Sequence, residues 1–435
     1  MEQSLEPSGH LRRIQRRTVV ILIICAAIST IDRAALAVAN PLIRKDLGLS
    51  VADMGLLLSA FLWAYAFTQI PIGPLVDRFG PRRVLALGMA LWSAAQLACG
   101  MVSSAAQLAC ARALLGVGEA PQFPSGAHVI RSWFALPDRG RATGYFLCAS
   151  YLGTGLAVPL ITTLMLSFGW RWMFVLLGVA GLIVAAVWAL FYKKPQRMNL
   201  SVADQAYLGV GSHQPASPAF SLRAWLRLFK NRITWGLVLG YMGVIYVNWL
   251  FNSWLPGYLH MQRHMSLVKV GWAAAIPYVC AVLGAIAAGY VVDFLMKRGV
   301  SVTSSRKIPS CVFLLVQALM VVLAINSHSG AGAVACLSGA MFCGTAATSI
   351  AWAMVSAFAP ADSTATIGSL QNCGGYIGGA SAPIVTGFIV QASGSFNMAL
   401  YIGAGMSLFA ALVYLLLVRE RYAGLEGCDT VSAAS

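Results

Sequence analysis

Charged side chains are scarce in this chain, and acidic ones are the scarcest. Asp and Glu number 14 in 435 residues, Lys and Arg number 30, and the four together make up 10% of the sequence. A soluble domain usually carries about 25% charged residues. The low charge and the hydrophobic fraction of 59% therefore exclude an ordinary soluble protein and indicate a polytopic membrane protein. At about 35 residues for a helix with its loop, the length predicts roughly twelve spans.

Several chemical motifs are also missing from the sequence. Nine of the ten cysteines lie in apolar runs, where Cys behaves as a small hydrophobe, and no CxxC or Cys/His ligand spacing occurs. We therefore predict no disulfide framework, no metal site and no cofactor. No nucleotide-binding P-loop is present, which argues against ATP-driven transport within this chain. The longest loop, residues 193–232, is too short and too poor in motifs for an attached enzyme or sensor domain, so we predict no catalytic residues.

The apolar runs form two groups of six. The predicted spans lie near 18–40, 52–76, 84–103, 105–127, 141–162 and 171–192, then near 233–256, 269–292, 308–326, 331–357, 364–391 and 396–418. The fold class expected is therefore an all-α membrane protein with 12 transmembrane helices in two pseudo-symmetric six-helix bundles. Its parts are a tail at 1–17, a bundle at 18–192, a loop at 193–232, a bundle at 233–418 and a tail at 419–435.

Basic residues set the predicted orientation. Short cytoplasmic loops collect Lys and Arg, and only Arg44, Lys45, Arg171, Arg263 and Lys269 fall on the side opposite the N-terminus. Both termini are therefore expected in the cytoplasm. We expect the protein in the inner or plasma membrane of the cell. The net charge of +16 is then a topology signal with attraction to anionic lipid, and we expect no nucleic-acid partner.

Residues 12–31, basic at first and then apolar, also resemble a signal peptide, with a conceivable cleavage site at residues 35–37. Cleavage there would remove Asp32 and Arg33 and leave an odd number of helices. We therefore interpret this stretch as an uncleaved first span.

Two pairs of charges lie deep inside predicted spans. Asp32 and Arg33 are adjacent in the first span, and Arg112 and Glu119 are seven residues apart in the fourth, so the second pair projects from nearly one helix face. An ionised side chain at bilayer depth costs at least about 2.5–3.5 kcal/mol and persists where it is paired or functional. The pattern indicates either a carboxylate-binding, proton-coupled site or two structural salt bridges, Asp32 with Arg112 and Glu119 with Arg33.

The two halves share a short repeat. Gly73 and Asp77 end the second span and are followed by Arg78, Gly80, Arg82 and Arg83; Gly289 and Asp293 end the eighth span and are also followed by basic residues. Repeats that meet around a midplane site are typical of transporters.

Residues 73–83 (GPLVDRFGPRR) resemble the loop 2–3 signature of the major facilitator superfamily. Residues 30–34 (TIDRA), 59–65 (SAFLWAY), 119–124 (EAPQFP) and 132–134 (SWF) further resemble its anion:cation symporter branch, with galactonate, glucarate and hexuronate permeases. The resemblance implies alternating access driven by protons. We expect a functional monomer, although the sequence does not fix the oligomeric state.

The resemblance also implies residue roles. Asp32 and Glu119 match the proton-carrying acids, and Arg33 and Arg112 belong to the substrate region; the sequence leaves open which arginine binds the carboxylate. The remaining candidates for substrate binding are Tyr65, Ser150, Ser349, Trp352 and Asn372. The predicted conformational latch consists of Gly73, Asp77, Arg78, Gly80, Arg82, Arg83 and Asp293.

Two positions depart from the sugar-acid pattern. Thr30 stands where the branch often has a tyrosine, and Ser150 stands where it has a glutamine. Loss of a phenol and a long amide weakens the case for a polyhydroxylated substrate, so an aromatic or short-chain carboxylate such as phthalate or hydroxybenzoate is an alternative. A drug/proton antiporter is a second alternative, which the paired arginines oppose. The sequence also leaves open whether Na⁺ replaces H⁺.

Overall fold

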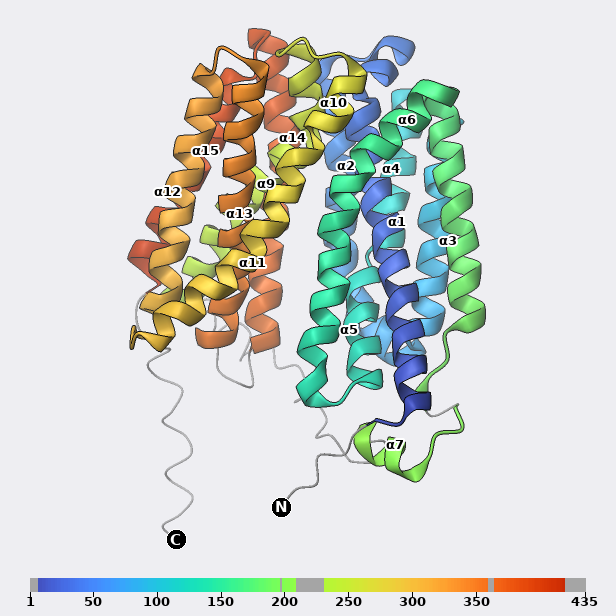
Figure 1. The fold of residues 1–435 in the computed structure, drawn as a ribbon. Coiled ribbons are helices and arrows are strands. Elements are labelled where there is room, and N and C mark those ends of the chain that lie inside the picture. Colours follow the sequence, from blue (N-terminus) through green and yellow to red (C-terminus); the bar gives the residue numbers. More distant parts are fainter. Residues whose placement is uncertain (1–6, 196–197, 209–230, 359–363, 419–435) are drawn as a thin grey trace. The chain divides into compact units, whose positions relative to one another are not determined.

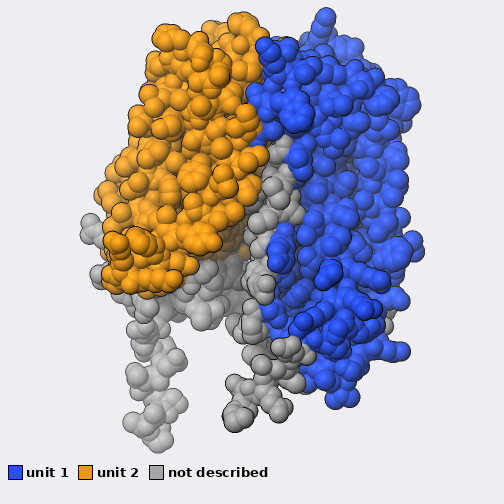
Figure 2. Space-filling model, in the orientation of Figure 1, with its two compact units in different colours: residues 1–216, 266–275 blue, residues 217–265, 276–435 orange. Residues whose placement is uncertain are grey.

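The structure is a computed structural model that describes residues 7–195, 198–208, 231–358 and 364–418, and within these ranges the regular elements are helices (Figure 1). The chain forms two compact units, one of residues 1–216 and 266–275, the other of residues 217–265 and 276–435 (Figure 2). The predicted tail at 419–435 and residues 209–230 of the predicted loop lie outside the described residues.

Unit 1 contains α1 (Gly9–Leu47), α2 (Val51–Phe79), α3 (Pro81–Cys99), α4 (Ala105–Glu119), α5 (Gln122–Trp133), α6 (Leu136–Phe191), α7 (Val202–Leu208) and α10 (Leu267–Ala273). Unit 2 contains α9 (Arg232–Met261), α11 (Ala275–Lys297), α12 (Ser304–Asn326), α13 (Gly330–Phe358), α14 (Thr364–Ser393) and α15 (Asn397–Leu417).

Nine helices in the described ranges are long and apolar enough to cross a membrane. They are Gly9–Leu47, Val51–Gln69, Leu156–Phe191, Arg232–Met261, Leu267–Lys297, Ser304–Asn326, Gly330–Val355, Ile367–Ser393 and Asn397–Leu417. The all-helical membrane class is confirmed, while the number of twelve spans and the side on which the termini lie stay predictions.

The helix ends are set by local sequence. Ser50 and Asp53 form a capping box at the start of α2, and Ser104 accepts a hydrogen bond from the backbone of Gln107 at the start of α4. Gly169 has a φ of 83° within α6, a backbone conformation that residues other than glycine rarely adopt. The backbone is therefore not helical there, and α6 consists of two helical arms.

The predicted span at 105–127 is divided into two helices. α4 ends at Glu119 and α5 begins at Gln122, with Pro121 at the N-cap. Proline has no N–H and its ring clashes with the preceding turn, so a helix cannot run through it undisturbed. Gln69 donates to the carbonyl of Ala120 at 3.2 Å, an acceptor that Pro124, four residues further on, cannot satisfy because it has no N–H. Glu119 is consequently the last residue of a helix.

Two glycines hold α4 tightly between its neighbours. A Cβ added to Gly116 would lie 2.4 Å from the carbonyl oxygen of Phe61 on α2, and one added to Gly118 would lie 2.6 Å from the backbone nitrogen of Trp92 on α3. Only glycine permits such close helix contact. The backbone of α4 is therefore fixed on both sides beside Glu119.

Unit 2 is built around an apolar core. Leu237 and Tyr241 of α9 pack with Ile350 and Met354 of α13 and with Tyr414 of α15, and all five are at most 4% exposed. This core is formed by long, largely uncharged helices, as the apolar runs predict.

Candidate functional site

Arg33 and Glu119 form a buried ion pair in unit 1. Arg33 Nε of α1 donates to Glu119 Oε2 of α4 at 2.5 Å, and Ser29 Oγ donates to the same oxygen at 3.0 Å. Glu119 is fully buried, while the Arg33 side chain is 18% exposed. Of this pair, only the arginine is open to a ligand.

Arg112 lies deeper than Arg33. It is 2% exposed, and its Nη1 donates to the main-chain carbonyl of Asp32 at 3.4 Å. Asp32 is 1% exposed, and the indole of Trp92 interacts with its carboxylate. Charge interactions connect Asp32 to both Glu119 and Arg112. The two acids and two arginines therefore form one cluster, whose closest ion pair is Arg33 with Glu119.

Aromatic rings surround the exposed arginine. The guanidinium carbon of Arg33 lies 5.3 Å from the ring centre of Phe61, 5.1 Å from that of Tyr65 and 5.9 Å from that of Phe123. The guanidinium of Arg112 lies 5.3 Å from the same Phe61 ring. Such cation–π contacts are worth roughly 0.5–2 kcal/mol each. The rings carry no net charge, so the guanidinium that they stabilise keeps its positive charge and can still attract an anion.

The sequence singled out Tyr65 for substrate binding, but Tyr65 is 1% exposed and lies against Arg33 instead of lining an open surface. Phe61 and Phe123 were not singled out. Both fall inside the quoted motifs at 59–65 and 119–124, and membership of these motifs was the signal that could have identified them.

Candidates in the second half of the chain are described within unit 2 alone. Trp352 is 43% exposed, and its indole donates to the hydroxyl of Tyr241 at 3.0 Å. Ser349 and Asn372 are half-buried. The side chain of Ser150, in unit 1, lies outside the described residues.

Unit 2 also contains two hydrogen-bonded pairs of neutral polar side chains. Asn248 of α9 donates to Thr348 Oγ1 of α13 at 2.9 Å, and Ser407 Oγ of α15 donates to Gln317 Oε1 of α12 at 3.1 Å. Gln317 and Ser407 are fully buried. The sequence analysis missed these two, although a glutamine and a serine in otherwise apolar spans were visible.

The predicted latch residues lie at helix ends. Arg82 donates twice to the carbonyl of Ala189 near the end of α6, at 2.9 and 2.6 Å, and Gly80 has a φ of 82°. Arg78, Arg83 and Asp293 are exposed, Gly73 is half-buried, and the side chain of Asp77 lies outside the described residues. The structure thus assigns Arg82 a contact within unit 1, and the latch remains a prediction.

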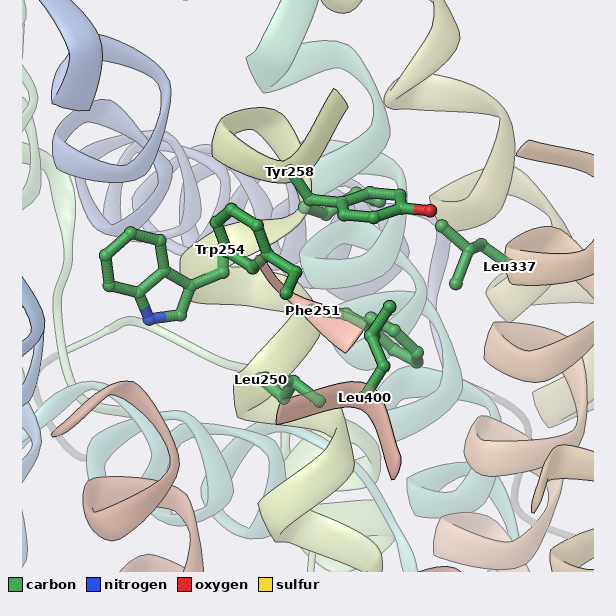
Figure 3. A pocket seen from close by; sticks show the side chains of 8 residues that line it. Leu250, Phe251, Trp254, Tyr258, Leu337 and Leu400 are labelled. Atoms are coloured by element: carbon green, nitrogen blue, oxygen red, sulfur yellow. The ribbon is translucent and has the colours of Figure 1, made fainter. Parts of the chain in front are cut away.

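A pocket in unit 2 is apolar and does not fit an anion (Figure 3). It is lined by Leu250, Phe251, Trp254, Leu255, Tyr258, Leu337, Phe396 and Leu400. The one hydroxyl among these side chains, that of Tyr258, accepts a hydrogen bond from Arg263 at 2.6 Å. In the described part of the chain, no three His, Cys, Asp or Glu side chains are grouped so as to hold a metal ion.

Known proteins resemble this chain along nearly its whole length. The Major Facilitator Superfamily matches residues 22–383. The chain is 38% identical over 416 residues to the probable L-galactonate transporter of Escherichia coli K12, covering 96% of this chain and 92% of that protein. It is 33% identical over 430 residues to the probable galactarate/D-glucarate transporter of Bacillus subtilis 168, covering 95% and 94%.

A solved structure supports the same fold. A bacterial homologue of the human lysosomal transporter Spinster, in an inward-facing and unoccupied conformation, superposes with a TM-score of 0.73 at 20% identity, covering 93% of this chain and 95% of that one. With the buried charge cluster and the membrane-length helices, these matches show that the chain is a multi-pass membrane transporter, not an enzyme, and that it belongs to the major facilitator superfamily.

Proposed function

We propose that this protein is a proton-coupled symporter that takes up a small organic anion, a sugar acid or another carboxylate, by alternating access. The observation that carries the proposal is the ion pair between a partly exposed Arg33 and a fully buried Glu119. A guanidinium binds a carboxylate through two parallel hydrogen bonds and stays charged when buried. Arg33 is therefore our choice for the substrate's carboxylate, and Arg112 remains within the cluster.

Competition between substrate and Glu119 supplies the coupling. An anion that binds Arg33 weakens its bond to Glu119 and leaves a buried carboxylate without its cation. Taking up a proton removes this penalty. Proton and anion therefore bind together, and each raises the affinity for the other.

Relatives support the substrate class. Relatives that are 38% and 33% identical are named for L-galactonate and for galactarate and D-glucarate, and a hexuronate transporter of Bacillus subtilis is 30% identical over 429 residues. Asp32 is the second proton-carrying acid in this proposal. The lipid bilayer is the other partner, and we propose that the monomer is the functional unit.

One observation favours the alternative of an aromatic carboxylate. Thr30 Oγ1 donates to the carbonyl of Ala26 at 2.8 Å, so this hydroxyl is already used within α1. Phe123, which is half-buried, adds aromatic surface beside Arg33. A ring-bearing acid would find apolar contacts there that a polyol would not use.

The test is uptake into proteoliposomes containing the purified full-length chain. Labelled galactonate, glucuronate, tartrate, phthalate and hydroxybenzoate are each offered with an imposed pH gradient, then with a sodium gradient. Accumulation of at least one acid that depends on the pH gradient supports the proposal. If accumulation is driven only by the sodium gradient, the coupling ion is Na⁺ and not H⁺. If no acid is transported and apolar cations are exported in exchange for protons, the protein is a drug/proton antiporter.

A further inference from the structure

We propose that the substrate carries a single carboxylate on an otherwise neutral body, and that dicarboxylates are discriminated against. This inference rests on the proposed function, because it names the class of acid that Arg33 would bind. Its basis is the number and position of cations within the membrane-spanning part of the chain.

The first step concerns unit 1. Arg33 and Arg112 are the two Lys or Arg residues in the interior of its predicted spans; Arg141 and Arg171 stand at the first position of two others. Arg112 is 2% exposed, contacts the main chain of Asp32 and interacts with the charges of Asp32 and Glu119. It is thus enclosed with the acids that it neutralises. The 18% exposure of Arg33 leaves one cation for an incoming anion.

The second step concerns unit 2. Its predicted spans at 233–256, 308–326, 331–357, 364–391 and 396–418 contain no Lys, Arg, Asp or Glu, and the span at 269–292 has only Lys269 at its first position. The groups available there are amides, hydroxyls and an indole, including Asn248, Thr348 and Trp352. These groups bind hydroxyls or neutral rings but do not neutralise a carboxylate.

The sequence repeat of the two halves shows which residue of the second half corresponds to Asp32. Asn248 lies as far after Asp32 as Gly289 lies after Gly73 and Asp293 after Asp77. Where the first half has an acid at the head of its charge cluster, the second half has a neutral amide bonded to Thr348. The second half therefore has no cation at the place in its repeat where the first half has its charge cluster.

The cluster of two acids and two arginines is neutral when all four side chains are ionised, so each carboxylate that binds adds one uncompensated negative charge. One proton compensates one bound carboxylate, but a second carboxylate would be desolvated without a cation or would need a further proton. An unpaired charge at bilayer depth is disfavoured strongly enough to lower affinity at least about 100-fold. Dicarboxylates should therefore compete poorly even where their shape fits.

The experiment uses wild-type protein in proteoliposomes and matched acids. Uptake of the labelled monocarboxylate found to be transported, galactonate or hydroxybenzoate, is measured against unlabelled competitors at pH 7. The competitors are galactonate, galactarate and galactarate monomethyl ester in one series, and hydroxybenzoate, phthalate and monomethyl phthalate in the other. Each ester keeps the skeleton of its diacid and removes one charge.

We expect the dicarboxylate of the active series to compete at least about 100-fold more weakly than the monocarboxylate, and its monoester to recover most of the loss. A dicarboxylate that competes equally well overturns the inference and leaves the proposed function intact. A monoester as weak as its diacid also overturns it, because shape and not charge would then decide. If no acid of either series is transported, the proposed function itself fails.

Discussion

Arg33 and Arg112 differ in what surrounds their guanidinium groups. Arg33 is partly exposed, is enclosed by three aromatic rings and donates to Glu119; Arg112 is buried and contacts the main chain of Asp32. The same residue type therefore has two environments within one cluster. The difference predicts that substitutions at the two positions affect different properties.

Replacing Arg33 with lysine should lower the initial rate of uptake by about 10- to 100-fold. An ammonium keeps the charge but loses the planar, two-pronged geometry, and a hydrogen bond to a charged group is worth about 1.5–3 kcal/mol. The measurement is uptake into proteoliposomes at matched protein density. Arg171→Lys is the control, because Arg171 pairs with Asp46 where both side chains are more than 40% exposed and such pairs contribute little. Normal transport by Arg33→Lys would remove Arg33 from the substrate site.

Replacing Glu119 with glutamine should separate exchange from accumulation. The amide resembles the protonated acid, so substrate should still bind Arg33 and exchange for unlabelled substrate across the membrane. Accumulation against a gradient should be lost, because no proton is released from this position. If Glu119→Gln accumulates substrate with unchanged dependence on external pH, the coupling role passes to Asp32.

The position of α4 between its neighbouring helices depends on glycine. Gly116→Ala would place a methyl group 2.4 Å from the carbonyl oxygen of Phe61, so backbone must move. Overpacking of this kind typically costs about 1–3 kcal/mol, and the charges on α4 would shift with it. We expect a lower melting temperature in detergent together with weaker uptake.

Gly405→Ala provides the matched control for this prediction. Gly405 is exposed on α15, and an added Cβ would meet nothing within 4 Å. Alanine should be neutral or slightly stabilising there, because it favours helix by about 1 kcal/mol over glycine. Equal melting temperatures for the two variants would show that the close contact of α2 and α4 is unimportant for stability.

α7 is attached to the start of α1 through one carboxylate. Asp204 accepts from the backbone nitrogen of Ser8 at 2.9 Å, from Ser8 Oγ at 2.7 Å and from Ser201 Oγ at 2.9 Å. Desolvation acts to raise the pKa of Asp204, but the bonds from Ser8 and Ser201 and the nearby His10 outweigh it and hold this pKa below its ordinary value. The ionised form is thus the one that attaches α7.

The sign of the pH effect follows from this lowered pKa. The stabilisation is complete above the ordinary pKa of an aspartate, about 3.9, and is lost as the pH falls through the lowered value. Hydrogen exchange at residues 202–208 should be protected at neutral pH and fast in Asp204→Asn. Equal protection in the variant and the wild type would show that other contacts hold α7.

The sequence predicted helices better than it predicted contacts. Apolar runs are local signals, and the helices of the described residues lie on most of the predicted runs. The break between Glu119 and Gln122 was visible only as a proline. The ring contacts of Phe61 and Phe123 with Arg33, and the depth of Arg112, depend on how α1, α2, α4 and α5 pack, and spacing along one helix does not determine that packing.

At the scale of the whole molecule, the charged groups inside the spans decide how transport responds to voltage. The cluster of Asp32, Glu119, Arg33 and Arg112 is neutral when all four are ionised. The other charged residues of the predicted spans stand at the first or second position of a span: Asp53, Arg141, Arg171 and Lys269. A monoanion that enters with one proton therefore carries no net charge across the membrane. We predict electroneutral uptake, unchanged by a potassium diffusion potential set with valinomycin at constant pH gradient. Stimulation by an inside-negative potential would mean that a second proton moves, and the variant Asp32→Asn, which removes the other buried acid, should then abolish the voltage dependence while Glu119 still couples transport to pH.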